Sequence, residues 1–219
     1  MSRRLYWLSC AISLVLVAVS VYGALRIPPD MPLPVHWNIR GEADWYLPRN
    51  TVLVLAPALA IIMSLIYAAI PMIEPRKENA KRSAGLYYAS WFGLLCVTLT
   101  IHSAVVFSAV RGQDPSPLIV FASASTLIIV IGNYMTKSRS NWFFGLRTPW
   151  SLSSEQAWIA ANRATGWLFV ITGILSAIVA SMLDIRSGFT ILAVGVFASA
   201  LIGAAVSYQH WRQDGEQAQ

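Results

Sequence analysis

Residues 132–166 read GNYMTKSRSNWFFGLRTPWSLSSEQAWIAANRATG and lie between two long apolar runs. Four basic residues occur in this stretch with a single acid, Glu155, and tryptophan and phenylalanine are frequent among them. Cations mixed with tryptophans beside lipid-length runs are typical of the cytoplasmic membrane–water boundary. Residues 144–150 (FGLRTPW) place a flexible glycine close to a rigid proline, which predicts a fixed loop. Ser153 and Gln156 have capping-box spacing and predict a short helix from about Ser154.

The composition of the whole chain indicates a membrane protein. Hydrophobic residues make up 56% of the 219 residues and charged residues 12%, against about 25% charged in soluble domains. Six apolar runs approach or exceed the roughly 20 residues that a spanning helix needs. The sequence therefore predicts an all-α, polytopic bundle of six transmembrane helices. The predicted spans are 5–25, 51–73, 84–110, 117–135, 164–183 and 189–208.

These spans divide the chain into five expected segments. They are a two-helix unit (1–73) containing a proline-rich loop (26–50), a pair of helices (74–135), the Arg/Trp loop with its short helix (136–163), a second helix pair (164–209) and a disordered tail (210–219). The first run exceeds the apolar core of a signal peptide, so we interpret it as an uncleaved helix.

The distribution of lysine and arginine predicts the orientation. With both termini in the cytoplasm, eleven of the sixteen lie inside and five outside, as the positive-inside rule requires. We therefore interpret the net charge of +6 as loop charge. No phosphate-binding or zinc-finger motif indicates nucleic acid. Cys10 and Cys96 both lie in apolar spans, which argues against a disulfide framework.

The loop at 26–50 then faces outward. Its five prolines exclude a regular helix. We expect residues 35–38 to be extended and residues 38–41 to form a turn. The candidate ligand-contact residues are His36, Trp37, Asn38, Gly41 and Asp44 here, together with His102 in the third span. Histidine with carboxylates is capable of acid–base chemistry, but the spacing matches no metal template. The alternative is that these side chains hydrogen-bond the turns of their own loop.

His102 is the one ionisable side chain within the predicted spans. Intramembrane ionisable residues are functional candidates, so we expect the outward polar cluster to approach His102. The competing interpretation is a hydrogen bond to a serine or threonine on a neighbouring helix. Without acids or other bases in the spans, the sequence offers no proton relay for a coupled transporter. We assign no catalytic residue, metal or cofactor.

A second set of candidates lies at the cytoplasmic motif, as a structural element or a docking site for a partner. Its members are Asn133, Asn141, Gly145, Arg147, Thr148, Pro149, Trp150, Trp158 and Arg163. Arg147 has the planar donors to bind a carboxylate or phosphate, or it extends to lipid headgroups. The tryptophans are equally suited to anchoring at the interface.

Small residues recur every four positions in the last two spans, at Gly173, Ala177 and Ser181 and at Gly195, Ser199, Gly203 and Ser207. Such stripes allow helices to pack closely in lipid. We expect them to pair the fifth and sixth helices. A homo-oligomer seam is the alternative.

Residues 131–135 (IGNYM), 141–150 (NWFFGLRTPW) and Trp158 resemble the SdpI family of bacterial immunity proteins. The outer residues 34–38 (PVHWN), with Gly41 and Asp44, are similar to an uncharacterised domain often found in the N-terminal half of such proteins. One departure is Asn162, where the family pattern commonly has histidine, so no role of that histidine is carried over.

The resemblance implies a multi-pass protein of the bacterial cytoplasmic membrane that protects its cell against a secreted peptide toxin. In some systems it also implies a signal to a cytoplasmic repressor. The alternatives from the residues themselves are a membrane enzyme or small-molecule permease with an outward site near His36, Asp44 and His102, or a sensor whose cytoplasmic loop captures a regulator.

Overall fold

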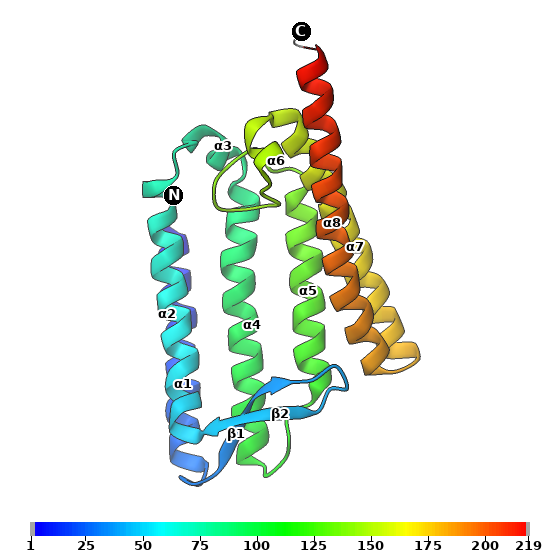
Figure 1. The fold of residues 1–219 in the computed structure, drawn as a ribbon. Coiled ribbons are helices and arrows are strands. Elements are labelled where there is room, and N and C mark those ends of the chain that lie inside the picture. Colours follow the sequence, from blue (N-terminus) through cyan, green and yellow to red (C-terminus); the bar gives the residue numbers. More distant parts are fainter. Residues whose placement is uncertain (1–2, 218–219) are drawn as a thin grey trace. The chain divides into compact units, whose positions relative to one another are not determined.

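The computed structural model describes residues 3–217, and six of its helices are long and apolar enough to cross a membrane (Figure 1). They contain 19 to 33 residues, or roughly 28 to 50 Å at 1.5 Å per residue. The predicted all-α polytopic architecture is confirmed. The six helices are α1 (Arg3–Arg26), α2 (Arg49–Ile73), α4 (Ala84–Val110), α5 (Pro117–Met135), α7 (Glu155–Met182) and α8 (Ile185–Gln217).

The loops contain four shorter elements, which are β1 (Pro32–Trp37), β2 (Ala43–Pro48), α3 (Lys77–Arg82) and α6 (Pro149–Ser153). The loop at 26–50 was expected to hold one extended piece, but it forms an antiparallel β1–β2 hairpin. The expected turn is present: the Gly41 amide donates to the Asn38 carbonyl at 2.9 Å, and Gly41 has a φ of 77°. Glycine adopts that conformation without a Cβ clash.

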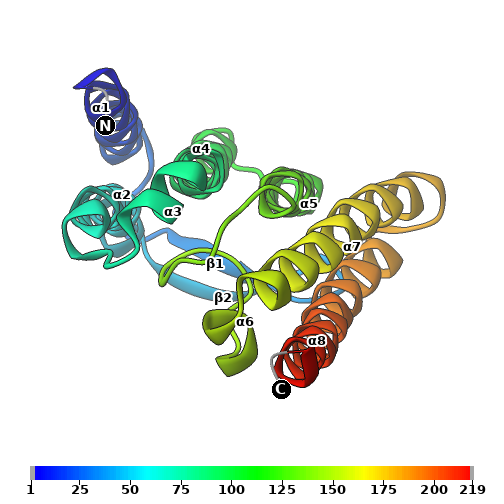
Figure 2. The same ribbon diagram turned by 90° about the horizontal axis from the view of Figure 1, so that it is seen from above.

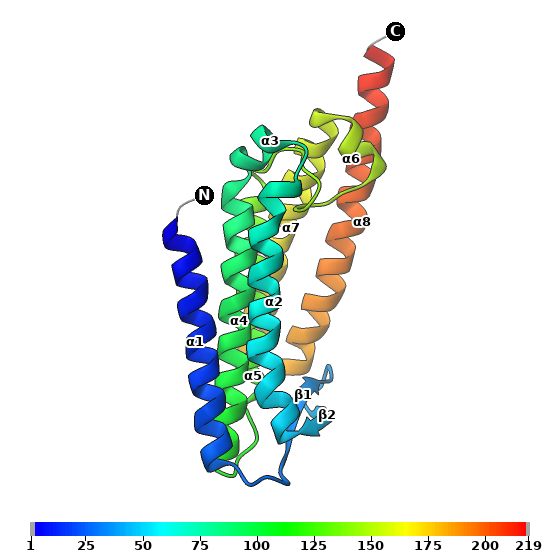
Figure 3. The same cartoon turned by 90° about the vertical axis from the view of Figure 1, so that its left-hand side faces the viewer.

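The described chain divides into two compact units that do not follow chain order. The first comprises residues up to 68 together with 91–124, and the second comprises 69–90 together with residues from 125 onward. In the first unit the hairpin lies beside the joined ends of α1 and α2 (Figure 3). Leu33 of β1 is buried with Val52 and Leu53 of α2 and with Val105 and Val106 of α4. Apolar burial therefore holds the hairpin against these helices.

In the second unit α7 and α8 lie side by side (Figure 2). A Cβ on Gly203 would lie 1.9 Å from Thr165 Oγ1, and one on Gly195 would lie 2.4 Å from Thr172. The stripe on α8 thus packs against α7 as expected. Gly173 differs, because a Cβ there would meet Ile129 of α5 at 2.5 Å. The stripe on α7 therefore packs in part against α5 rather than α8.

Helix α7 corrects two boundaries. The short helix expected near residue 154 and the fifth span are one continuous helix, because residues 155–165 contain no glycine or proline to interrupt it. Its N-cap is Ser154, whose hydroxyl accepts a hydrogen bond from the Ala157 amide. The capping box lies one helix earlier, where Thr148 and Ser151 cap α6.

The tail expected to be disordered is helical as far as Gln217, and residues 218–219 lie outside the described chain. Tyr208 packs edge-on against Trp150, with ring centres 5.0 Å apart. Arg212 pairs with Glu216 one turn later. Aromatic packing and an i,i+4 ion pair both favour helix over coil.

Candidate functional site

The loop between α5 and α6 is shaped by a buried asparagine. The Asn141 side-chain oxygen accepts hydrogen bonds from the amides of Phe143 (3.0 Å) and Phe144 (2.7 Å). Its amide group donates to the Arg139 carbonyl at 2.9 Å. Asn141 is only 1% exposed. An asparagine that bonds the backbone two and three residues ahead imposes a tight turn, so this side chain sets the path of the loop.

Gly145 continues the turn and lies against α7. Its φ is 102°, and a Cβ there would lie 2.5 Å from Asn162 Oδ1 and 3.0 Å from the Trp158 ring. The Asn162 oxygen accepts from the Leu146 amide at 2.7 Å, and its nitrogen donates to the Trp158 carbonyl at 3.1 Å. Asn162, the departure from the family pattern, thus holds the loop on α7 through neutral hydrogen bonds.

The rest of the motif starts α6 and joins it to α8. The Thr148 hydroxyl accepts from the Ser151 amide at 3.0 Å and lies 2.7 Å from the Ser207 hydroxyl. Pro149 occupies the first turn of α6, where its missing N–H costs nothing. Trp158 is fully buried, and its indole N–H donates to Ser138. Trp158 is therefore a core residue and not an interfacial anchor.

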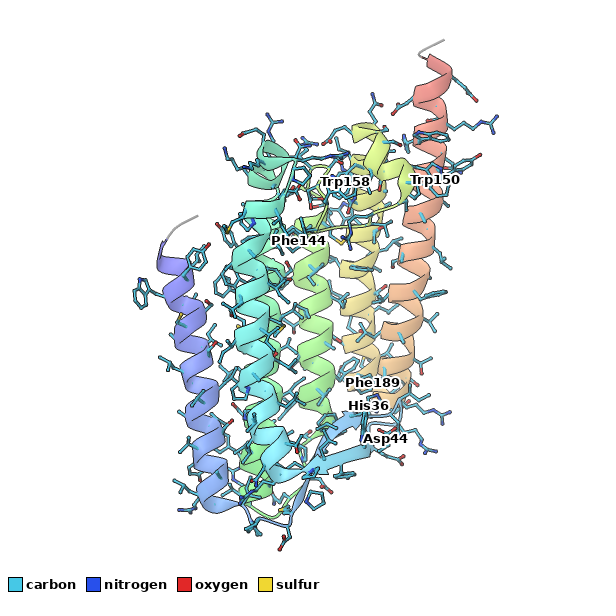
Figure 4. The ribbon with its side chains drawn as sticks, turned by 60° about the vertical axis from the view of Figure 1, so that its left-hand side comes forward. His36, Asp44, Phe144, Trp150, Trp158 and Phe189 are labelled. Carbon is cyan, nitrogen blue, oxygen red and sulfur yellow. The ribbon has the colours of Figure 1, made fainter. Side chains whose placement is uncertain are left out.

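Figure 4 shows Phe144, Trp150 and Trp158 gathered at the end of the second unit that carries α6. Three other members of the motif point away from this core. Arg147 is exposed and donates to the Trp142 carbonyl at 2.7 Å, while Asn133 and Arg163 are exposed on α5 and α7. The motif thus has a buried structural part and an exposed polar part.

The partner of this loop, which was not predicted from the sequence, is the connection from α2 to α4. Glu74 is 2% exposed, and its carboxylate accepts from the Trp142 amide at 3.0 Å and from the Arg76 amide at 2.8 Å. The Arg76 side chain donates to the Ser140 hydroxyl and, at 2.7 Å, to the Leu152 carbonyl. We call Glu74, Arg76, Ser140, Trp142 and Leu152 the loop junction.

Two further contacts extend the junction. Asn79 donates to the Ser140 carbonyl at 3.0 Å, and the Arg139 amide donates to the Ser83 hydroxyl at 2.8 Å. A signal for this arrangement exists in the sequence, because Glu74 is an acid directly after an apolar span and inside a basic loop. An acid in that place needs a local donor, which the 136–154 loop supplies.

The candidate residues His36, Asn38 and Asp44 make side-chain hydrogen bonds at the surface of the hairpin. His36 and Asp44 point toward each other, with 2.6 Å between Nδ1 and Oδ1 (Figure 4). Near the tip, Glu42 accepts from Asn38 at 3.0 Å and from Arg40 at 2.9 Å. The Asn38 hydrogen bond, followed by the charge of Arg40, lowers the pKa of Glu42 below its ordinary value of 4.5. Trp37 instead packs against the buried core of the first unit.

His102 lies in a different environment from His36. It is 4% exposed, and its Nε2 lies 2.9 Å from the Ser20 hydroxyl on α1, whereas the His36 side chain is 60% exposed. Among the described residues no hydrogen bond joins His102 to the hairpin. The structure therefore favours the helix-neighbour interpretation of His102 over a site shared with His36. In residues 3–217, no group of three or more His, Cys, Asp or Glu side chains has a metal-binding arrangement.

The six long apolar helices define a multi-pass membrane protein. Residues 137–208 match the SdpI/YfhL protein family. The chain is also similar to the Immunity protein SdpI of Bacillus subtilis (strain 168), with 23% identity over 204 residues, covering 92% of this chain and 95% of that protein. The resemblance to the SdpI family is confirmed. No solved structure matches this chain.

Proposed function

We propose that this chain is an immunity protein of the bacterial cytoplasmic membrane that protects its cell against a secreted peptide toxin. The observation that carries the proposal is the end-to-end similarity to the Immunity protein SdpI, which covers 92% of one chain and 95% of the other. A shared domain would match only a part of each protein. Correspondence along both lengths supports a common role for the whole protein, and that role is not enzymatic.

In this proposal both termini face the cytoplasm and the β1–β2 hairpin faces outward. The excess of lysine and arginine on the side of the loop junction supports this orientation. The hairpin is then the part that meets the toxin. Trp45 and Tyr46 support this assignment, because they are 61% and 43% exposed, and large exposed aromatic side chains are common at binding surfaces.

The cytoplasmic motif serves mainly to hold the second unit together. This role is supported by the burial of Asn141, Trp158 and Asn162 and by the direction of their hydrogen bonds toward neighbouring loops. A second candidate function, a signal to a cytoplasmic repressor, is favoured by Arg147 and Arg163. Both are exposed, and neither has a carboxylate within 4.0 Å in the described part of the chain.

The membrane-enzyme or permease alternative has less support. It required His36, Asp44 and His102 to share one site. His36 and Asp44 pair with each other at the surface, while His102 pairs with Ser20. Exposed ion pairs of this kind are common structural features of a hairpin and contribute little energy.

The experiment is a challenge assay. The chain is expressed in a toxin-sensitive bacterium, and the cells are exposed to secreted peptide fractions, beginning with culture supernatant of Bacillus subtilis. We expect growth at toxin concentrations at least about tenfold above those that stop cells carrying the empty vector, roughly the effect of 1.4 kcal/mol of binding. Immunoblotting of membranes confirms equal protein levels. Failure to protect against every fraction, with the protein present in the membrane, would overturn the proposal.

A further inference from the structure

The two edges of the hairpin differ in the hydrogen-bonding groups that they offer. The register places Pro34 opposite Tyr46 and Leu33 opposite Leu47. In an antiparallel pair, opposite residues exchange both hydrogen bonds or neither. Pro34 has no N–H, so Pro34 and Tyr46 form a pair without mutual hydrogen bonds. The N–H and C=O of Tyr46 therefore point away from β1, toward the free edge of β2.

The free edge of β1 is blocked by its own sequence. Pro32 and Pro34 both stand at positions whose backbone groups face outward, and neither has an N–H. Prolines at an edge prevent pairing with another strand. β1 also lies between β2 and α4 (Figure 2), where Leu33 is buried. Only β2 thus retains an edge with donors.

The edge of β2 is exposed, and the carboxylates beside it have partners on the hairpin. Asp44, Trp45 and Tyr46 are exposed in succession. The carboxylate of Asp44 pairs with His36, and Glu42 near the tip pairs with Arg40. Edge strands of natural proteins are usually protected by lysine, proline or a bulge that faces outward. On β2 the register shift falls at Asp44, and the next outward-facing residue after Tyr46 is Pro48. The free edge between them therefore offers the N–H and C=O of Tyr46, with the exposed side chains of Trp45 and Tyr46 beside them.

The unpaired backbone groups of the β2 edge indicate which kind of partner it binds. Unpaired N–H and C=O groups at strand spacing are complemented by another extended backbone, which lipid headgroups do not provide. We propose that the free edge of β2 binds an extended segment of the peptide toxin as a third strand, with Trp45 and Tyr46 contacting its side chains. The inference rests on the proposed immunity function and identifies its binding element. Because the exposed side chains at this edge are aromatic, the matching segment is apolar.

Hydrogen exchange on the unmodified protein tests this inference directly. The full chain is placed in lipid nanodiscs and mixed with the toxin fraction purified from the challenge assay. In the free protein we expect the Tyr46 amide to exchange quickly and the Leu47 amide slowly, since Leu47 pairs with Leu33. The toxin should slow Tyr46 exchange at least about tenfold, the effect of one added hydrogen bond.

A pair of variants tests the same edge in cells. Tyr46→Pro removes the outward N–H and leaves the bonds to β1, whereas Tyr46→Ala removes the side chain and keeps the N–H. We expect Tyr46→Pro to tolerate about tenfold less toxin than Tyr46→Ala. Slow Leu47 exchange in Tyr46→Pro shows that the hairpin is intact. If the hairpin opens in Tyr46→Pro, the exchange rate of the Tyr46 amide in the unmodified protein tests the inference instead.

The outcomes separate the two proposals. If the parent chain gives no protection, the immunity function fails and the edge inference fails with it. If the parent protects but the toxin leaves Tyr46 exchange unchanged, or Tyr46→Pro protects as well as Tyr46→Ala with its hairpin intact, only the edge inference is overturned. Slowed Tyr46 exchange on concentrating the protein alone would indicate that β2 pairs with a second copy, which also overturns it.

Discussion

The Glu74 carboxylate accepts a hydrogen bond from the backbone N–H of Trp142 at 3.0 Å, across 68 residues of sequence. Its second oxygen accepts from the Arg76 amide. Two loops that enter the second unit from different helices are therefore joined through one buried side chain. A buried carboxylate requires such donors, because an unpaired charge is costly away from water. The position of the Trp142–Arg147 segment thus depends on a residue outside the region that matches the family.

Replacing Glu74 with glutamine should destabilise this unit. Glutamine keeps the shape of the side chain but replaces one acceptor oxygen with an amide NH2 group. This donor would face a backbone N–H, which is also a donor. We expect a loss of about 1–3 kcal/mol, measured by thermal unfolding of the purified protein in detergent. Glu78→Gln is the matched control, because Glu78 is exposed and pairs only with Lys81, and it should unfold like the parent. Equal unfolding temperatures for the two variants would show that the junction contributes nothing.

Gly145→Ala should be more damaging than Gly112→Ala. Both glycines have positive φ, at 102° and 65°, but only Gly145 has neighbours that a Cβ would meet. The backbone strain of about 1–2 kcal/mol applies to both, and overpacking adds about 1–3 kcal/mol at Gly145. The same unfolding assay measures the difference. If Gly112→Ala proves at least as destabilising, close packing against Asn162 is not the reason for glycine at 145.

Arg147→Lys should protect cells nearly as well as the parent, and Arg147→Ala less well. The described hydrogen bond of Arg147 runs from one guanidinium nitrogen to the Trp142 carbonyl, and a lysine ammonium is able to replace a single donor. The challenge assay with matched membrane levels provides the comparison. A lysine variant that loses protection while unfolding normally would instead indicate that the planar guanidinium recognises a partner.

Acidification should loosen the tip of the hairpin. The pKa of Glu42 is below 4.5 in the folded chain, chiefly through the Asn38 hydrogen bond. A depressed pKa contributes stability above the ordinary value, and this stability is lost as the pH falls through the folded-state pKa. Exchange of the Gly41 amide, corrected for its intrinsic pH dependence, should therefore accelerate below pH 4.5. Glu42→Gln should remove this dependence, and an unchanged profile in that variant would assign the effect to another group.

Reporter fusions test the orientation. Fusions at Asp44 and Asp114 should report the outside, and fusions at Glu78, Ser140 and Gln217 the cytoplasm, because most lysine and arginine lies on the second side. A cytoplasmic signal at Asp44 would reverse the charge argument and remove the hairpin from contact with any secreted toxin.

The helical architecture was predictable because it depends on the lengths of apolar runs. The spans 84–110 and 117–135 were predicted with the bounds that α4 and α5 have in the structure, since charged or proline-rich connections flank them. A run of about 20 apolar residues has few alternatives to a helix in lipid. The turn at Asn38–Gly41 was predictable because asparagine and glycine favour a turn locally.

The extent of α7 and α8 was harder to predict from the sequence. Residues from about 154 to 163 were expected to form a separate short helix and residues from 210 a disordered tail, whereas α7 is continuous from Glu155 and α8 continues to Gln217. At that end of the second unit Tyr208 packs on Trp150, and Ser154 donates a hydrogen bond to Asp214. A small-residue stripe predicts close packing but does not identify the neighbour. Gly173 therefore faces α5, although the spacing alone favoured α8.

Sequence alone determined the membrane class, the six spans, the charge asymmetry and the resemblance carried by residues 141–150, all of which are local patterns. Only the tertiary structure decided that Glu74 joins Trp142, that Asn162 holds Leu146, that His102 pairs with Ser20, and that β2 keeps a free edge. Each of these depends on groups distant in the chain or on strand register. Which distant groups meet is decided by packing and by the requirement that buried polar groups find partners, and neither leaves a periodic signal in the sequence.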